Sequence, residues 1–278
     1  MNPLHRPGRF VRAQRTLVRL HSSASRAIAL LATSVFLFAG ATDAAEVKVM
    51  ISGGFLPAYR ILAPEFQSAT GHSVATASGP SMGNTPEAIP NRLSRGEPVD
   101  VLIMVGSALD ELVEQGKVLP GSRVDLARSK IGMAVRSGTP NPDIGTVEAF
   151  KRALLAARSI AYSDSASGVY LSKVLFPKLG IAEQIAGKSR MIPAEPVGAV
   201  IARGDAQIGF QQMSELLAVP GVEIVGPLPP EIQKVTVFSA GISSESREPD
   251  AARALVKFLS SPAAAPVIAR TGIEPVNP

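Results

Sequence analysis

Short strand-like segments alternate with helical segments through most of this sequence, and this alternation limits the possible folds more than any other feature. Residues 46–51, 73–77 and 98–105 have the composition of strands, and a helical pattern follows each of them. The third segment, PVDVLIMV, is too apolar to alternate, as expected of a parallel strand that is covered on both faces. The pattern predicts an α/β protein with a largely parallel sheet.

The strand and helix series starts again after the loop 136–145, RSGTPNPDIG, whose two prolines and two glycines exclude a regular element. Strands SIAY, RMIPA, AQIGF and GVEIVG follow, each separated from the next by a helix, and the long strand KVTVFSAGI can return the chain to the first part. We therefore expect two lobes with a ligand cleft between them. Lobe 1 comprises residues 46–128 and 239–278, and lobe 2 comprises residues 129–238.

The beginning of the chain has the pattern of a secretory leader. The first 41 residues carry six arginines and no acid, and they include most of the apolar run AIALLATSVFLFAGATDAA. Small residues at the end of this run offer cleavage sites between 41 and 45, and the run is short for a membrane span. We expect residues 1–45 to be a signal peptide that directs the protein to the periplasm. An uncleaved anchor and an over-extended start are the alternatives.

Composition after the leader argues against several classes of function. Without the six leader arginines, 22 of the 28 basic residues remain against 23 acidic ones, and they form no basic cluster, so nucleic-acid binding is not expected. The chain has no cysteine, which excludes disulfides and thiolate chemistry. His72 is the one histidine after the leader, so no metal site is expected.

The loops that follow the predicted strands are rich in serine and glycine and poor in cations. Ligands bind at the carboxyl ends of strands in open parallel sheets, where glycine lets the backbone come close and helix N-termini present unpaired N–H groups. These loops therefore suit a small anion, although helix capping explains each loop taken alone. The candidate binding residues are Ser52, Gly53, Gly54, Ser78, Ser81, Met82, Ser107, Tyr162, Ser165, Ser167, Gly168, Tyr170, Gln211 and Gln212.

Two acids in the same loops, Asp164 and Glu195, are the candidate catalytic residues. A carboxylate that is buried in a cleft has a raised pKa and can serve as a base. Both acids also have a structural interpretation: Asp164 can cap the next helix, and Glu195 stands at the favourable end of another. The sequence leaves these alternatives open.

The segments SGGFLPAY, RGEPVDVLIM and VGAVIARGDAQIGFQQMSEL resemble the molybdate-binding branch of the periplasmic type II solute-binding proteins. The resemblance covers essentially the whole chain after the leader, and it implies a two-lobed type II fold with the ligand between the lobes. In molybdate binders the first two loops offer serines to the oxyanion, and the counterpart of the last segment supplies a tyrosine. Gly54 and Gln212 stand near two of these positions here, which puts molybdate in doubt as the ligand.

The segments PSMGNTPEAIPNRLSRGEP, AYSDSASGVYLSKVLFP and GFQQMSEL resemble the aconitate isomerases, which are built on the same fold. This resemblance implies an allylic proton shift between trans- and cis-aconitate without a cofactor, in which a positioned carboxylate moves the proton and serines with backbone N–H groups hold the tricarboxylate. The alternative is a non-catalytic binding subunit of an ABC importer for molybdate-like oxyanions or organic acids, with an ABC permease as its partner.

Overall fold

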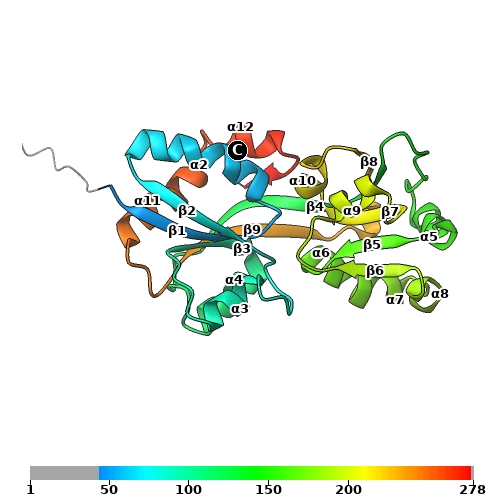
Figure 1. Ribbon diagram of the computed structural model, residues 1–278, viewed down its shortest axis with the longest axis horizontal. Helices are drawn as coiled ribbons and strands as arrows, with labels where there is room; N and C mark the ends of the chain where they lie inside the picture. The colour runs from blue at the N-terminus through cyan, green and yellow to red at the C-terminus, as the bar shows by residue number, and fades with distance from the viewer. Residues whose placement is uncertain (1–43, 277–278) are drawn as a thin grey trace, which may run out of the picture. The chain divides into compact units, whose positions relative to one another are not determined.

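The computed structural model describes residues 44–276, so the predicted signal peptide lies almost wholly outside the described residues (Figure 1). The strands are β1 (Glu46–Ile51), β2 (Ser73–Ser78), β3 (Val101–Val105), β4 (Val124–Arg136), β5 (Ile160–Ser163), β6 (Ser189–Ile192), β7 (Ile208–Gln212), β8 (Val222–Pro227), β9 (Val235–Ile242) and β10 (Glu274–Pro275). They pair in the order β2-β1-β3-β9-β4-β7-β5-β6, and β8 and β10 both pair with β4.

Helices cover both faces of this sheet, and none of those in residues 44–276 is long and apolar enough to cross a membrane. They are α2 (Leu56–Thr70), α3 (Ile89–Ser94), α4 (Gly106–Glu114), α5 (Val147–Ala156), α6 (Ala166–Tyr170), the π-helical turn η1 (Leu171–Leu175), α7 (Phe176–Lys178), α8 (Ala182–Ala186), α9 (Val197–Arg203), α10 (Met213–Leu217), the 3-10 turn η2 (Pro230–Ile232), α11 (Pro249–Leu259) and α12 (Ala265–Arg270).

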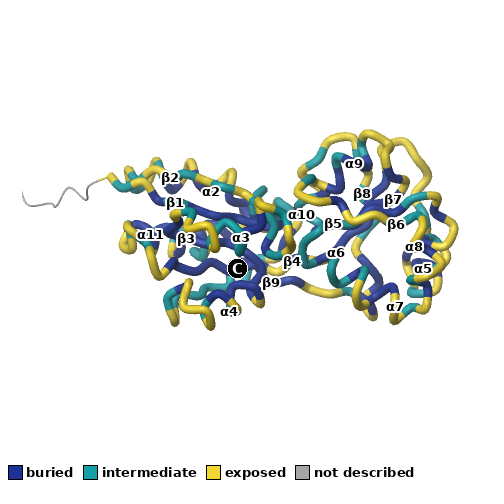
Figure 2. The backbone as a smooth tube through the Cα atoms, turned by 60° about the horizontal axis from the view of Figure 1, so that its bottom comes forward, coloured by how far each residue is buried: buried dark blue, intermediate teal, exposed yellow. Residues whose placement is uncertain are grey.

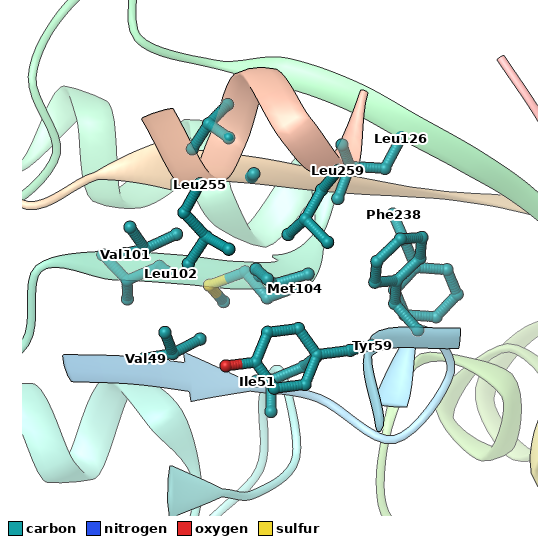
Figure 3. Close-up of a cluster of buried hydrophobic side chains, with 14 of the residues drawn as sticks. Val49, Ile51, Tyr59, Val101, Leu102, Met104, Leu126, Phe238, Leu255 and Leu259 are labelled. Carbon is teal, nitrogen blue, oxygen red and sulfur yellow. The ribbon is translucent and has the colours of Figure 1, made fainter. Parts of the chain in front are cut away.

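One hydrophobic core surrounds β1, β3 and β9. Strands β1, β2 and β3 run parallel, and β9 joins β3 in the antiparallel direction. Figure 1 shows α2 and α12 on one side of these strands and α3 and α4 on the other. Leu102, Met104, Tyr59 and Phe238 are buried in this core, as the close-up in Figure 3 shows. Every residue of β3 is buried, which confirms that PVDVLIMV contains a strand covered on both faces.

A second set of buried residues surrounds β5, β6 and β7, which are also parallel to one another. Successive residues of β5 face opposite sides of the sheet. Ile160 packs with Phe150 and Phe210 on one face, and Ala161 packs with residues of α9 on the other. The tube in Figure 2 shows buried backbone in both parts of the described chain.

Two strands, β4 and β9, connect the two sets of buried residues. β4 pairs with β9 from Val124 to Lys130, and from Ile131 onward it pairs with β7 and β8. Along the chain, the first core takes its residues from the segment that ends at Ala127 and from the segment that starts at Phe238. The second core takes its residues from Ile131 to Ile232. We propose that the two cores are the two predicted lobes.

The central strands differ from the sequence expectation in two respects. Strand β4 begins at Val124, in a segment where the sequence pattern indicates no strand, because the mixed segment VDLARS satisfies its backbone groups by pairing with β9. The sheet is also mixed rather than largely parallel, since β4, β8, β9 and β10 make antiparallel pairs. Parallel pairing holds within each set of strand and helix units, as the alternation predicts.

Thr146 caps α5, because its Oγ1 accepts a hydrogen bond from the Ala149 N–H at 3.1 Å. We expect Thr146→Ala to lower the free energy of unfolding by about 1 kcal/mol, since it removes the cap. Thr146→Ser keeps the acceptor and should lose less than half as much. Urea denaturation measures both, and equal losses in the two variants would show that the cap is not the cause.

Candidate functional site

A cavity of about 310 Å³ lies where the strand ends of the two cores meet. Its wall includes the residues that end or follow β1, β2, β3, β5 and β7, which is where ligands bind in open parallel sheets. The lining residues are Ser52, Gly53, Gly54, Leu56, Ser78, Gly79, Pro80, Glu87, Val105, Ser163, Asp164, Ser165, Ala166, Ser167, Ala194, Glu195, Pro196, Gln211, Gln212, Glu215 and Phe238.

Most of the residues predicted from the sequence come together in this lining. They are Ser52, Gly53, Gly54, Ser78, Asp164, Ser165, Ser167, Glu195, Gln211 and Gln212. These residues come from five separate segments of the chain, at or just after the ends of β1, β2, β5, β6 and β7, and the order of the strands in the sheet brings them together.

Three of the predicted residues in the first half of the chain lie outside the cavity lining. The Ser81 hydroxyl is buried and accepts a hydrogen bond from the N–H of Val105 at 3.0 Å. It therefore stabilises the position of a lining residue and does not face the cavity itself. Met82 packs against the first hydrophobic core. Ser107 is exposed in the first turn of α4.

Both predicted tyrosines and Gly168 also lie away from the cavity lining. Tyr162 packs edge-on against Phe176 with ring centres 5.9 Å apart. The Tyr170 hydroxyl donates to the Ile232 carbonyl at 2.9 Å, so it ties α6 to the segment before β9. Gly168 is needed for close packing, because a Cβ there would overlap the Ser163 carbonyl.

The cavity offers hydrogen-bonding groups that have no partner within the protein. Ser52 Oγ and Gln212 Oε1 are buried without a hydrogen-bond partner among the described residues, and both residues line the cavity. Helix α2 begins here at Leu56, and the helical run 166–178 begins next to Ser165, in both cases without a side-chain cap. The Ser52 hydroxyl and the start of the helical run 166–178 can donate hydrogen bonds to an anionic ligand. Gln212 Oε1 can only accept a hydrogen bond, and at the start of α2 the Leu56 N–H already donates to the Gly53 carbonyl.

The charged residues of the lining are all acidic: Glu87, Asp164, Glu195 and Glu215, with no Lys, Arg or His among the described residues that form it. Residues 44–276 contain no group of three or more His, Cys, Asp or Glu arranged to hold a metal ion. An anion can enter such a cavity only if backbone donors bind it and some of the carboxyl groups are protonated.

Burial raises the pKa of Asp164, and the nearby Glu87 raises it further, while a hydrogen bond from the Ala194 N–H at 3.1 Å lowers it. Burial also raises the pKa of Glu215, to about 7, and the charge of Asp164 acts in the same direction. These two carboxyl groups therefore bind protons more readily than ordinary acids do, and protonation of Glu215 reduces the negative charge at the cavity near neutral pH.

Glu195 has the opposite electrostatic environment. Arg203 donates hydrogen bonds to its carboxylate and thereby lowers its pKa, and the side chain is 40% exposed. The raised pKa expected of a buried base is therefore absent at Glu195. Arg203 lies only eight residues away at the end of α9, but its orientation toward Glu195 depends on how that helix packs.

Sequence reasoning missed Glu215, which lies at the third position of α10. Gln211 Oε1 accepts from the Val197 N–H at 2.9 Å, so the amide of Gln211 faces Glu215 and donates to its Oε1 at 2.8 Å. A signal for Glu215 was present in GFQQMSEL, because the first turn of a helix that follows a strand lies beside the end of that strand.

Helix α10 also contacts the loop that follows β1. Ser214 Oγ donates to the Gly54 carbonyl at 2.6 Å, and this hydrogen bond is buried. A Cβ at Gly53 would overlap the Glu215 carboxyl group, so the loop and the helix approach each other closely. These contacts bring residues of both cores to one cavity.

Ala194, which orients Asp164, is the one non-glycine residue in 44–276 with a positive φ, at 53°. This conformation costs ordinary residues about 1 kcal/mol, and such strain is common at functional sites.

We expect Ala194→Gly to leave the free energy of unfolding unchanged or to raise it. Ala199→Gly, inside α9, should lower it by about 1 kcal/mol. If urea denaturation shows the same loss in the free energy of unfolding for both variants, the backbone at Ala194 is not strained.

Comparison with known proteins identifies the family of this chain and relatives whose names state a function. The model of the bacterial extracellular solute-binding protein family matches residues 47–274. The aconitate isomerase of a Pseudomonas species is 54% identical over 248 residues, which cover 89% of this chain and 94% of that enzyme. The molybdate-binding protein ModA of Azotobacter vinelandii is 28% identical over 253 residues, 87% of this chain and 95% of that protein.

Solved structures support the same fold. The periplasmic molybdate-binding protein of Azotobacter vinelandii matches with a TM-score of 0.66 and 23% identity, covering 82% of this chain and 98% of that one. A periplasmic thiamin-binding protein matches with a TM-score of 0.66 and 13% identity, covering 86% of each chain. These matches confirm the two-lobed type II fold that the sequence resemblance implies.

Proposed function

The chain belongs to the bacterial extracellular solute-binding protein family, and we propose that within this family it is an isomerase that interconverts trans- and cis-aconitate. The observation that carries the proposal is the 54% identity to an aconitate isomerase over nearly the full length of both chains. The proposed reaction needs no cofactor, because carboxyl groups, serine hydroxyls and backbone N–H groups are sufficient for a proton shift.

The chemistry of the cavity supports a tricarboxylate as the substrate. The Ser52 hydroxyl has no partner among the described residues, so it can donate a hydrogen bond to a substrate carboxylate from the first core. Ser165 and Ser167 line the cavity from the second core. Donors from both cores can therefore bind different carboxylates of one substrate, which would hold the reacting carbons between them.

The reaction is a proton shift across three carbons. A base removes a proton from the methylene carbon, the electron pair of that C–H bond moves into the allylic system, and a proton is delivered to the carbon two positions away. Hydrogen bonds to the substrate carboxylates stabilise the negative charge that develops. We propose Asp164 as a proton-transfer residue, because it lines the cavity and burial raises its pKa.

Incubation of the purified protein with trans-aconitate tests the function directly. We expect cis-aconitate to form, as followed by NMR, together with an increase in melting temperature when the substrate binds. A protein that yields no product at high enzyme concentration, but is stabilised by molybdate or another oxyanion, would instead be the non-catalytic binding subunit of an ABC importer. The similarity to ModA favours that function as the second candidate.

Asp164→Asn should separate substrate binding from turnover. We expect kcat to fall at least about 100-fold, since general acid or base catalysis contributes that much, while the dissociation constant of trans-aconitate stays the same or falls. Glu195→Gln should lose less than tenfold, because Arg203 already pairs with that carboxylate. Isothermal titration and an NMR assay measure the two effects, and an Asp164→Asn variant with normal kcat would exclude Asp164.

We also propose that the protein is exported to the periplasm after cleavage of a signal peptide within residues 1–45. Support comes from the six leader arginines, the apolar run that follows them and the membership of an extracellular solute-binding family. Expression of the full chain in a Gram-negative host should place the protein in the periplasmic fraction, with its N-terminus between residues 42 and 46. An intact N-terminus in the membrane fraction would instead indicate an uncleaved anchor.

A further inference from the structure

We propose that Glu215 is a second proton-transfer residue, which works together with Asp164 in the allylic shift. This inference rests on the proposed isomerase function. Glu215 lines the same cavity as Asp164, and the strands that precede them, β7 and β5, are parallel neighbours in the sheet. The two carboxyl groups therefore extend from adjacent strand ends toward one space.

A hydrogen-bonded chain holds the Glu215 carboxyl group in position. The Val197 N–H donates to Gln211 Oε1, and this fixes which end of the amide faces Glu215. Gln211 Nε2 then donates to Glu215 Oε1 at 2.8 Å. A carboxyl group that moves a proton needs this kind of orientation, because proton transfer requires a short and well-directed approach to the substrate.

The glycine after β1 brings the first core up to this carboxyl group. A Cβ at Gly53 would overlap the Glu215 carboxyl group, so glycine is the residue that allows the approach. Gly53 and Ser52 both line the cavity, and the Ser52 hydroxyl has no partner among the described residues. A substrate carboxylate held by this loop would therefore place its neighbouring carbon close to Glu215.

No cation neutralises Glu215, since it takes part in none of the ion pairs found among residues 44–276. The other charged groups of the cavity are Glu87, Asp164 and Glu195, and the charge of Asp164 raises the pKa of Glu215. The pKa of Glu215 is raised to about 7, so a large share of the molecules have Glu215 protonated near neutral pH, and the charge of Asp164 favours that state. Asp164 is then the charged carboxylate and Glu215 the protonated carboxyl group.

This protonation state matches the needs of the allylic shift. The charged carboxylate removes the methylene proton, so that a C–H bond breaks and an O–H bond forms. The electron pair moves across the three carbons, and the protonated carboxyl group gives its proton to the far carbon, so that an O–H bond breaks and a C–H bond forms. The pair as a whole keeps one proton, and no oxidant, reductant or other reactant takes part.

Glu215→Gln tests the role of Glu215, because glutamine keeps an oxygen that can accept the hydrogen bond from Gln211. We expect kcat for trans-aconitate to fall at least about 100-fold, with a dissociation constant that is unchanged or lower. The wild-type protein in D2O should put deuterium into the recovered substrate, and the variant should not. Glu183→Gln, at an exposed position in α8, is the matched control and should keep its kcat within twofold.

The pH profile separates proton transfer from a merely structural role. We expect kcat/KM of the wild-type protein to follow a bell-shaped curve, because one carboxyl group must be charged and the other protonated. Glu215→Gln should remove one limb of the curve. Glu215→Asp keeps an ionisable group in a shifted position, so it should lower kcat and keep both limbs. It also provides a second test if the glutamine variant does not fold.

The possible outcomes distinguish this inference from the proposed function. A wild-type protein without isomerase activity would overturn both. An active wild type together with a Glu215→Gln variant within threefold of its kcat would overturn the role of Glu215 and leave the isomerase function intact. A variant that loses substrate binding as well as turnover would also overturn it, since Glu215 would then serve binding.

Discussion

The site depends on β4, the long strand that belongs to both parts of the sheet, and on its antiparallel pairing with β9. One part of β4 pairs with β9 beside the first core, and the next part pairs with β7 and β8 in the second. This continuous hydrogen bonding fixes where the ends of β1 and β2 lie relative to the ends of β5 and β7. The cavity forms because those ends face the same space.

The electrostatics of the cavity follow from its position between two cores. Burial removes water from Asp164 and Glu215, so both carboxyl groups favour the protonated form more than they would in solution. In the proposed mode of binding, backbone N–H groups and serine hydroxyls bind the anion instead of side-chain cations. On that proposal a cavity lined by acids accepts an anion, and its acids serve proton transfer near neutral pH.

The order of strands and loops along the chain is enough to predict part of the candidate site. Ser52, Gly53 and Ser78 follow strands that the residue pattern identifies, and the rule for ligands in parallel sheets places them at the site. Tyr162, in β5, and Tyr170, in α6, lie close to the site in the sequence, but their side chains pack with the second core. Side-chain direction depends on packing partners that lie far away in the sequence, so the pattern alone cannot give it.

The sequence by itself determined the alternation of strands and helices, the serine and glycine loops at the strand ends and the family resemblance, because these depend on local composition and spacing. Only the tertiary structure decided which acids can exchange protons. Glu215 is half-buried with Gly53 of the other core against its carboxyl group, while the Glu195 side chain is 40% exposed and paired with Arg203. Ionisation depends on solvent exclusion and neighbouring charge, and both arise only when distant segments pack together.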